Sequence, residues 1–266
     1  MQTFKIIHPS PALKPFVRYY WVLQDSSPGM VSQRTLPTGC MSLVFHRGER
    51  LKVVSRDDLQ PRCFISGQET GFTDVVSTGN IEMIVTVFQP HTAKMFFHIP
   101  VSLFCNRNIS IYDMEDIELQ DLAGKMGDAD NLETAVTLIE NFLLNRVLLG
   151  NSYNIQRLST VVRHISNSVH TNIKGLADIA CLSEKQFCRV FSEHIGTTPK
   201  DFLRIIRLQR TLSVLQYNPK IGFAQLSYEC GYTDQSHMIK EFRLFTGYTP
   251  KEYISRCAPV SDYFTF

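Results

Sequence analysis

The sequence predicts an α+β protein of two domains, in which a small β-barrel or sandwich with following helices precedes an all-α domain. Short β-branched and aromatic segments, separated by turns rich in Gly, Pro and Asn, fill about the first 112 residues. From Met114 onward, apolar residues recur at helical spacing. The C-terminal half contains an internal repeat with an offset of about 50 residues. A chain of 266 residues is long enough to bury two separate cores.

Aromatic and apolar segments predict strands in the first half. Residues 18–24 (RYYWVLQ), 41–46 and 51–55 have the composition of strands, and residues 47–50 (RGER) predict a hairpin turn between the last two. Residues 81–88 (IEMIVTVF) alternate apolar and polar side chains before they become wholly apolar. This pattern predicts a half-buried strand.

The pattern becomes helical after Pro90. Residues 91–98 predict one helix, which Pro100 stops. Residues 117–126 predict a second helix, which Gly127 ends.

Residues 131–149 predict a longer helix, with Asn131 as its N-cap and Gly150 as its stop. Its apolar residues form two stripes, one at positions 132, 136, 139, 143 and 147 and the other at positions 135, 138 and 142. Either both stripes pack inside their own domain, or one of them is a homodimer interface.

Polar residues 151–154 predict the boundary between an N-terminal domain, 1–150, and a C-terminal domain, 151–257, with a tail at 258–266.

The hydrophobic fraction of 44% and the charged fraction of 20% exclude a disordered chain. Residues 1–150 carry 13 Lys+Arg against 16 Asp+Glu, whereas the remainder carries 14 against 9. The basic C-terminal half is therefore suited to a polyanion.

Seven cysteines, without any C-x-x-C pair, favour reduced thiols over disulfides or a zinc knuckle. The first residues lack the apolar core of a signal peptide, and no apolar run approaches the roughly 18 residues of a membrane helix. We expect a cytoplasmic protein without a membrane partner.

The repeat predicts two helix-turn-helix units. Residues 176–183 align with 226–234, and GTTPKDF at 196–202 aligns with GYTPKEY at 247–253. Each copy reads as a short helix, a tight turn, a longer helix and a glycine stop. The expected N-caps at the turns are Ser183 and Asp234, and Pro199 and Pro250 open the helices that follow.

The helix predicted at 199–216 connects the two units and would be roughly 27 Å long. With its flanking turns, it would hold the two second helices about one DNA repeat apart, about 34 Å, so that one chain could read two successive major grooves. Arg189 and Lys240 occupy corresponding positions on the outer faces of these helices. Three arginines recur along the connecting helix, at 204, 207 and 210. Arg204, Arg207 and Arg210 are either a solvated face or contacts to DNA phosphates.

Residues 154–256 resemble the DNA-binding domain of AraC-type transcription regulators, above all at 230–238 (CGYTDQSHM) and 247–253. The first copy departs from the pattern at Cys181, where the turn commonly has Gly. By this resemblance, base contacts map to Lys185, Cys188 and Arg189 in the first unit and to Gln235, Ser236, Ile239 and Lys240 in the second.

The chemistry of these side chains supports only some of the assignments. Arg189 and Lys240 can donate to guanine O6 and N7, and Gln235 can pair with adenine. Cys188 and Ile239 can only contact a thymine methyl group or pack inward.

The N-terminal half resembles the barrel-plus-helices sensor domains that precede such DNA-binding units. Residues 39–45, 64–67 and 88–90, followed by Phe96-Phe97 and Asn106, carry this resemblance. It implies a domain that binds an effector or dimerises, without identifying the ligand. Aromatic residues in the predicted strands could line a pocket or could simply form the core.

The sequence carries no signature of an enzyme, a cofactor site or a metal site. It has no G-x-G-x-x-G, G-x-x-x-x-G-K or G-x-S-x-G segment, and His46, His91 and His98 are isolated from one another. We therefore expect no catalytic residues, no cofactor and no metal.

The function expected is that of a sequence-specific transcription regulator whose partner is double-stranded DNA. A small-molecule effector, a homodimer through 131–149 and a contact with RNA polymerase are further expected partners. The alternative is a protein-interaction module that docks a partner such as the polymerase and has little DNA specificity of its own. A barrel enzyme with an attached DNA-binding unit is disfavoured, because no paired catalytic constellation is present. The choice between activator and repressor stays open.

Overall fold

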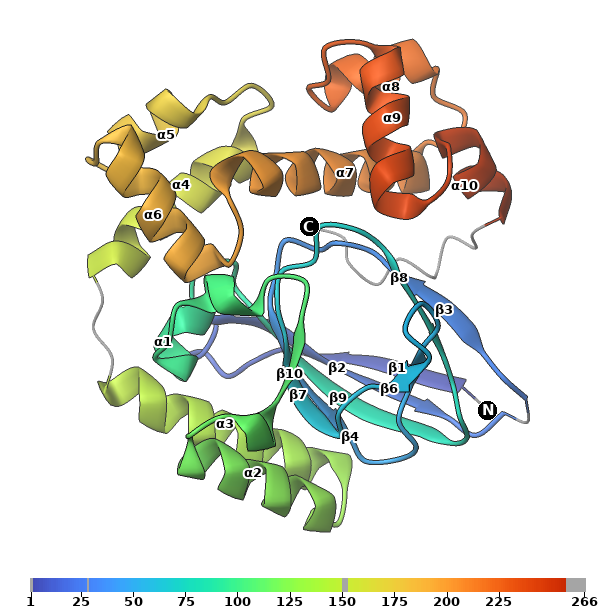
Figure 1. Cartoon of the computed structure of the whole chain (residues 1–266), viewed down its shortest axis with the longest axis vertical. Helices are drawn as coiled ribbons and strands as arrows, with labels where there is room; N and C mark the ends of the chain where they lie inside the picture. Colours follow the sequence, from blue (N-terminus) through green and yellow to red (C-terminus); the bar gives the residue numbers. More distant parts are fainter. Residues whose placement is uncertain (1, 28, 150–152, 257–266) are drawn as a thin grey trace.

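The computed structural model describes residues 2–27, 29–149 and 153–256 (Figure 1). The predicted domain boundary after residue 150, the helix stop at Gly150, Cys257 and the tail 258–266 lie outside the described residues. Two domains are present, a β-rich N-terminal domain with its helices and a helical C-terminal domain.

An antiparallel sheet of six strands forms the centre of the N-terminal domain. In hydrogen-bonding order the strands are β1 (Gln2–Ile7), β2 (Val17–Asp25), β9 (Ile81–Phe88), β4 (Ser42–His46), β7 (Cys63–Ser66) and β10 (Asn108–Ser110). The predicted strands at 18–24, 41–46 and 81–88 are confirmed, the last with the same bounds.

A second antiparallel sheet has four strands, in the order β3 (Ser32–Thr35), β8 (Thr73–Val76), β5 (Lys52–Val53) and β6 (Asp58–Leu59). No described strand pairs across from one sheet to the other, so the domain is a pair of open sheets and not a closed barrel.

The hairpin predicted around 47–50 is wrong. Strand β4 belongs to the first sheet and β5 to the second, so the chain crosses between sheets at this point. The backbone N–H groups of Arg47 and Gly48 donate instead to the carbonyl oxygen of Glu82. A Cβ atom on Gly48 would lie 2.5 Å from the carbonyl oxygen of Asn80, which explains the glycine in this crossover.

The central strand β9 is covered on both faces. Ile84 and Phe88 belong to the core under the helices, whereas Met83 and Val85 belong to the cluster between the sheets. The half-buried strand predicted at 81–88 is therefore buried on both faces instead, which explains why its sequence is almost wholly apolar.

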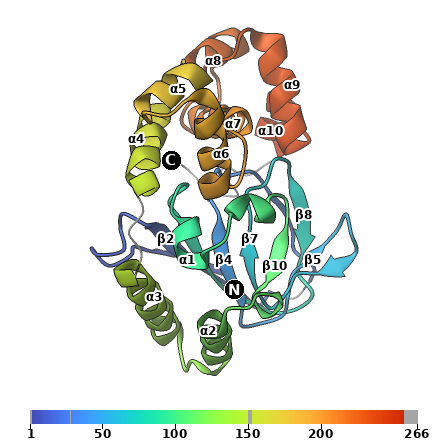
Figure 2. The same cartoon turned by 60° about the vertical axis from the view of Figure 1, so that its left-hand side comes forward.

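The helices of the N-terminal domain pack on one face of the six-stranded sheet. They are α1 (Ala93–Phe97), α2 (Ile117–Asp128) and α3 (Leu132–Leu149), with 3₁₀ turns η1 (Val101–Phe104) and η2 (Ile111–Asp113). Helix α1 is shorter than predicted, and α2 continues one residue past Gly127. Figures 1 and 2 show α2 and α3 together at the end of the molecule farthest from the C-terminal helices.

Both apolar stripes of α3 pack inside their own domain. Ala135 and Leu143 are fully buried, and Leu138 and Phe142 are partly buried against the same core. Among the side chains described in this helix, 132–147, the exposed ones are polar: Glu133, Thr134, Thr137, Asn141 and Asn145. The N-cap is confirmed, since Asn131 Oδ1 accepts a hydrogen bond from the backbone N–H of Thr134 at 2.8 Å. The structure thus favours the first of the two alternatives for this helix.

The C-terminal domain consists of seven helices over the described residues 153–256. They are α4 (Tyr153–Asn167), α5 (Ile173–Ile179), α6 (Glu184–Ile195), α7 (Pro199–Tyr217), α8 (Phe223–Glu229), α9 (Gln235–Thr246) and α10 (Pro250–Arg256). Helix α7 joins two small cores. Ile206 belongs to the core of the first unit, and its neighbour Ile205 belongs to the core of the second. No helix in the described ranges is both long and apolar enough to span a bilayer.

Candidate nucleic-acid interface

Each of the two predicted units is a helix-turn-helix. In the first, α5 and α6 meet at a turn where Leu182 N–H donates to the carbonyl oxygen of Ala177. In the second, α8 and α9 meet at the equivalent turn, where Tyr232 N–H donates to Ser227. The N-caps are confirmed: Ser183 forms a capping box with Gln186 at the start of α6. Asp234 Oδ1 accepts from His237 N–H at 2.8 Å at the start of α9.

The residue where the first copy departs from the family pattern adopts the same backbone conformation as its counterpart. Cys181 has a φ of 54°, and Gly231 has a φ of 78°. Cys181 is exposed, so its side chain has room. At Gly231 a Cβ atom would lie 2.7 Å from Val169 Cγ1 and 2.8 Å from its carbonyl oxygen, so only glycine fits there.

Helix α6 separates a buried face from an exposed one. Phe187, Phe191 and Ile195 are fully buried, whereas Lys185 and Arg189 are exposed. The third predicted base contact, Cys188, is partly buried against the core of this unit.

Helix α9 repeats the arrangement. Met238 and Phe242 are fully buried. The predicted base contacts Gln235, Ser236 and Lys240 are exposed, and Ile239 packs partly against the core. In both units, therefore, the polar candidates face solvent and the apolar ones point partly inward.

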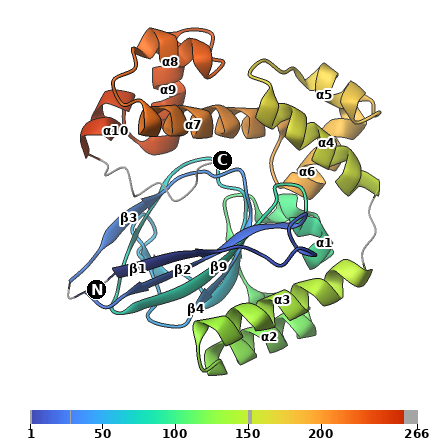
Figure 3. The same cartoon turned by 180° about the vertical axis from the view of Figure 1, so that it is seen from behind.

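The two second helices lie on one side of α7. In Figure 1 both α6 and α9 lie in front of α7, and in Figure 3, seen from behind, α7 lies nearer the viewer than either. These two helices, α6 and α9, are the candidate recognition helices, and they share one side of the helix that connects the units.

The three arginines of α7 do not form a solvated face, because each has partners within the chain. Arg204 Nε donates to Glu241 Oε1 at 2.7 Å, and Arg207 Nη2 donates to Glu241 Oε2 at 3.1 Å. Arg210 donates to the backbone carbonyl oxygens of Ile165, Ser166 and Ser168 at the end of α4. These arginines attach α9 and the end of α4 to α7.

Glu241 is the acceptor that the sequence did not reveal. It lies on α9, and its side chain is only 10% exposed. Burial acts to raise its pKa, but the hydrogen bonds and charges of Arg204 and Arg207 outweigh burial, so the pKa is lowered. No spacing rule connects α7 with α9, and only the folded arrangement brings the three residues together.

The N-terminal domain contacts both units. Lys94 of α1 forms an ion pair of 3.0 Å with Glu193 of α6. Next to it, His91 and His194 are buried, and the pKa of each is lowered to about 4. Burial is the main cause in both cases, and the charges of His194 and of Lys94, respectively, add to it.

Arg34 of β3 is the contact to the second unit. Its guanidinium forms two hydrogen bonds of 2.7 Å with the carboxylate of Asp74. The same group stacks over the rings of Phe72 and Tyr248, at 4.0 Å and 4.5 Å from their centroids. Its Nη1 also donates to the carbonyl oxygen of Thr246 at 2.8 Å, at the end of α9.

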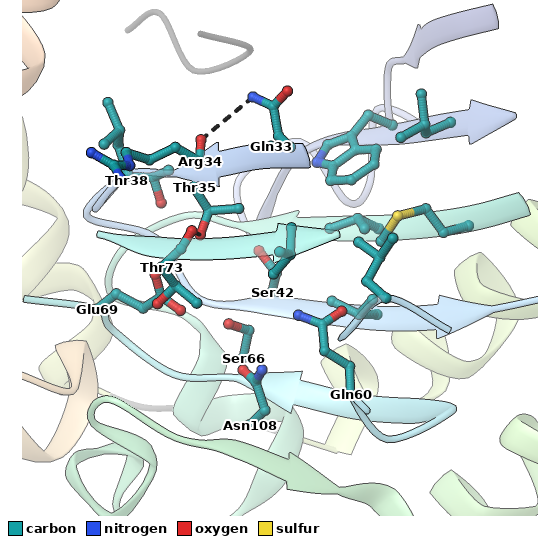
Figure 4. Close-up of a pocket in the computed structure, with 18 of the residues that line it drawn as sticks. Gln33, Arg34, Thr35, Thr38, Ser42, Gln60, Ser66, Glu69, Thr73 and Asn108 are labelled. Atoms are coloured by element: carbon teal, nitrogen blue, oxygen red, sulfur yellow. Dashed lines mark hydrogen bonds between the residues drawn. The ribbon is translucent and has the colours of Figure 1, made fainter. Parts of the chain in front are cut away.

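A cavity of about 190 Å³ lies between the two sheets. Figure 4 shows Thr35 and Thr73 from the smaller sheet, and Ser42 and Ser66 from the larger one, reaching toward the same space. Helix α7 also contributes to the lining, through Gln209 and Leu212. The cavity is therefore bounded by both domains.

The isolated histidines have separate surroundings. His46 is buried, is hydrogen-bonded through Nε2 to Gln60 Oε1 at 3.0 Å, and stacks on Phe64. His98 is exposed and occupies the left-handed position that ends α1. Over the residues that the structure describes, no three His, Cys, Asp or Glu side chains gather as a metal site.

Comparison with protein-family models finds two matches. Residues 176–256 match a helix-turn-helix domain, and residues 5–110 match a domain of unknown function, DUF6597.

Individual relatives match parts of the chain. An uncharacterized HTH-type transcriptional regulator of Haemophilus influenzae is 31% identical over 96 residues, which are 36% of this chain and 31% of that protein. The chain spans about a third or less of the length of the first curated relatives that it matches.

Two solved structures are similar at low identity. An AraC-type transcriptional regulator from Chromobacterium violaceum is 21% identical, with a TM-score of 0.36 over 41% of this chain and 100% of that one. ToxT from Vibrio cholerae is 10% identical, with a TM-score of 0.42 over 96% of both chains.

Proposed function

Residues 176–256 form an AraC-type helix-turn-helix domain, and from this we propose that the chain is a transcription regulator that reads two successive major grooves of DNA in a sequence-specific way. The observation that carries the proposal is the matched exposure of Arg189 on α6 and Lys240 on α9, on one side of α7. With 19 residues, α7 is roughly 28 Å long. This length, with its flanking turns, suits the repeat of about 34 Å that separates successive major grooves.

Each side chain predicted to contact a base from α6 or α9, the two recognition helices, has a proposed role. Arg189 and Lys240 donate to guanine edges, and Gln235 pairs with adenine. Lys185 and Ser236 stand at the same exposed ends of their helices and complete the polar contact set. Cys188 and Ile239, which pack partly inward, contribute at most an apolar contact to a thymine methyl group.

The N-terminal domain is proposed to regulate this activity through a small molecule held in the cavity between its sheets. The cavity supports the proposal because its lining includes Arg34, which contacts α9, and two residues of α7.

A homodimer and a contact with RNA polymerase are further proposals. Because both stripes of α3 are packed inside the domain, a dimer would have to use surface other than these stripes. With DNA and RNA polymerase as its partners, the protein would act in the cytoplasm.

The test is affinity selection of random duplex DNA by the full chain, followed by salt-titrated binding of the enriched sequences. Arg189→Ala and Lys240→Ala should each cost about 1–3 kcal/mol and relax the preference at one base pair. The matched control is Arg107→Ala, which removes an exposed arginine from the N-terminal domain. An enriched sequence that contains two short conserved elements about one helical turn apart supports DNA reading by both units. Equal losses on every sequence would reassign Arg189 to the phosphate backbone.

A further inference from the structure

We propose that the cavity between the two sheets binds a small organic cation, a protonated amine carried on an aromatic or apolar body. This names the chemical class of the effector in the site proposed above. Its regulatory consequence rests on the proposed function, whereas the binding itself does not.

An unpartnered carboxylate carries the proposal. Glu69 lines the cavity, and the structure gives it no hydrogen bond or ion pair within the described residues. Burial raises the pKa of Glu69 to about 7. The charge of Arg56 acts in the opposite direction, and its effect is smaller than that of burial. The Arg56 side chain is 53% exposed and is paired with Asp58 at 3.5 Å. The Glu69 side chain is half-buried. Taking a carboxylate even partly out of water without a counter-ion is costly, and an ammonium group supplies both the missing charge and the missing donors.

The other charged groups of the lining disfavour an anionic ligand. Arg34 has its guanidinium bound to both carboxylate oxygens of Asp74. Asp25 is buried and accepts a hydrogen bond of 2.8 Å from Ser27 N–H. The described lining therefore has two carboxylates and a single cation, which is already neutralised.

The apolar walls suit the body of such a ligand. Phe4 and Trp21 lie with ring centroids 5.8 Å apart, and Phe64 also lines the cavity. Aromatic faces attract cations and pack well against aromatic ligands. A volume of about 190 Å³ lies below the range typical of pockets for drug-sized ligands, so the occupant is small.

The occupant would be in contact with both domains. Gln209 of α7 lines the cavity and donates through Nε2 to the carbonyl oxygen of Pro37 at 2.5 Å. Arg34 of β3 lines the cavity from the N-terminal domain and contacts the end of α9. A ligand that displaces either side chain changes how the recognition helices are attached.

Trp21 provides a direct test, because it is the only tryptophan in the chain and it lines the cavity. The full chain is titrated with phenethylamine, with its neutral analogue 2-phenylethanol and with the anion 3-phenylpropanoate. Tryptophan fluorescence reports binding without any DNA. The pH is held about one unit above the pKa of Glu69, so that the carboxylate is ionised.

The amine should bind at least tenfold more tightly than the alcohol or the acid, and Glu69→Gln should remove this preference. Glu133→Gln, an exposed carboxylate on α3, is the matched control and should keep it. If the alcohol or the acid binds as well as the amine, or the amine leaves Trp21 unaffected, the proposal is overturned. Thermal unfolding of both variants shows that the effect is not a loss of fold.

A second arm separates this proposal from the proposed function. DNA affinity is measured with and without saturating phenethylamine. Amine binding without any DNA binding upholds the ligand class and overturns the regulator. DNA binding without amine binding does the reverse.

Discussion

The side chain of Arg34 donates a hydrogen bond of 2.8 Å to the backbone carbonyl oxygen of Thr246, the last residue of the second recognition helix. The carbonyl groups at the end of a helix have no partner within the helix, and they carry the negative end of its dipole. One guanidinium thus satisfies a helix terminus in one domain while it pairs with Asp74 in the other.

Arg34→Ala should loosen the second unit from the N-terminal domain. Loss of the charged hydrogen bonds and of the stacking on Tyr248 should cost about 1–3 kcal/mol. Hydrogen exchange should speed up in α10 and at the end of α9, but not in α6, which is attached separately by Lys94. Uniform exchange changes over both units would contradict this assignment.

Arg204→Ala distinguishes the observed pairing with Glu241 from the phosphate contact predicted for the α7 arginines. Its pairing with Glu241 predicts a loss of about 1.5–3 kcal/mol in the free energy of unfolding, because a buried carboxylate loses a charged donor. The slope of DNA affinity against salt concentration should stay the same.

A role in phosphate contact gives the opposite pattern, a slope reduced by about one unit with unchanged stability. Glu241→Gln serves as the partner variant. The double variant should cost less than the sum of the single ones, which urea unfolding would reveal.

The two turn residues should respond in opposite directions to substitution. Gly231→Ala should destabilise the chain by more than about 1 kcal/mol, since its φ is positive and the added Cβ meets Val169. Cys181→Gly should stabilise it by up to about 1 kcal/mol by relieving a left-handed residue. Gly124→Ala within α2 has free space and should be stabilising, as a control for the loss of glycine entropy. Denaturant unfolding compares all three, and a stable Gly231→Ala variant would rule out the close approach to Val169.

Stability should fall as the pH drops from about 6.5 toward 4. His91 and His194 have pKa values lowered from 6.5 to about 4, so the unfolded chain binds more protons in this window. Each histidine therefore contributes stability that is complete above pH 6.5 and decreases by up to about 1.4 kcal/mol per pH unit below it.

His91→Gln and His194→Gln should each flatten the dependence of the unfolding free energy on pH. His46, whose pKa is also about 4, accounts for part of the dependence that remains. An unchanged slope in both variants would show that the histidines at the α1–α6 contact are not the source.

Local signals in the sequence were sufficient for much of the fold. The strand 81–88 was predicted with its observed bounds, because a mainly apolar, β-branched segment between turn residues has few alternatives. Caps such as Ser183 and Asp234 fixed the starts of the recognition helices, since the hydrogen bond that makes a cap is formed within three residues.

Features that depend on distant partners were not predicted. The segment 47–50 reads as a hairpin turn, yet β4 pairs with β7 and β9, a choice that sequence proximity does not encode. In the same way, Arg207 reads as a solvated or phosphate-binding residue until Glu241 is placed beside it. Glu69 gives no signal in the sequence, because what distinguishes it is that the described residues offer it no hydrogen bond or ion pair.

The adjacent residues Ile205 and Ile206 of α7 face different cores, and this limits how the protein can evolve. One inserted residue in this helix would turn one unit by about 100° relative to the other and lengthen the connection by about 1.5 Å. Such a change would expose apolar residues in one core and at the same time misalign the two recognition helices, α6 and α9. A lineage that carries this domain can therefore alter the bases it prefers by exchanging exposed side chains on α6 and α9. It cannot adjust the distance between the two sites in small steps.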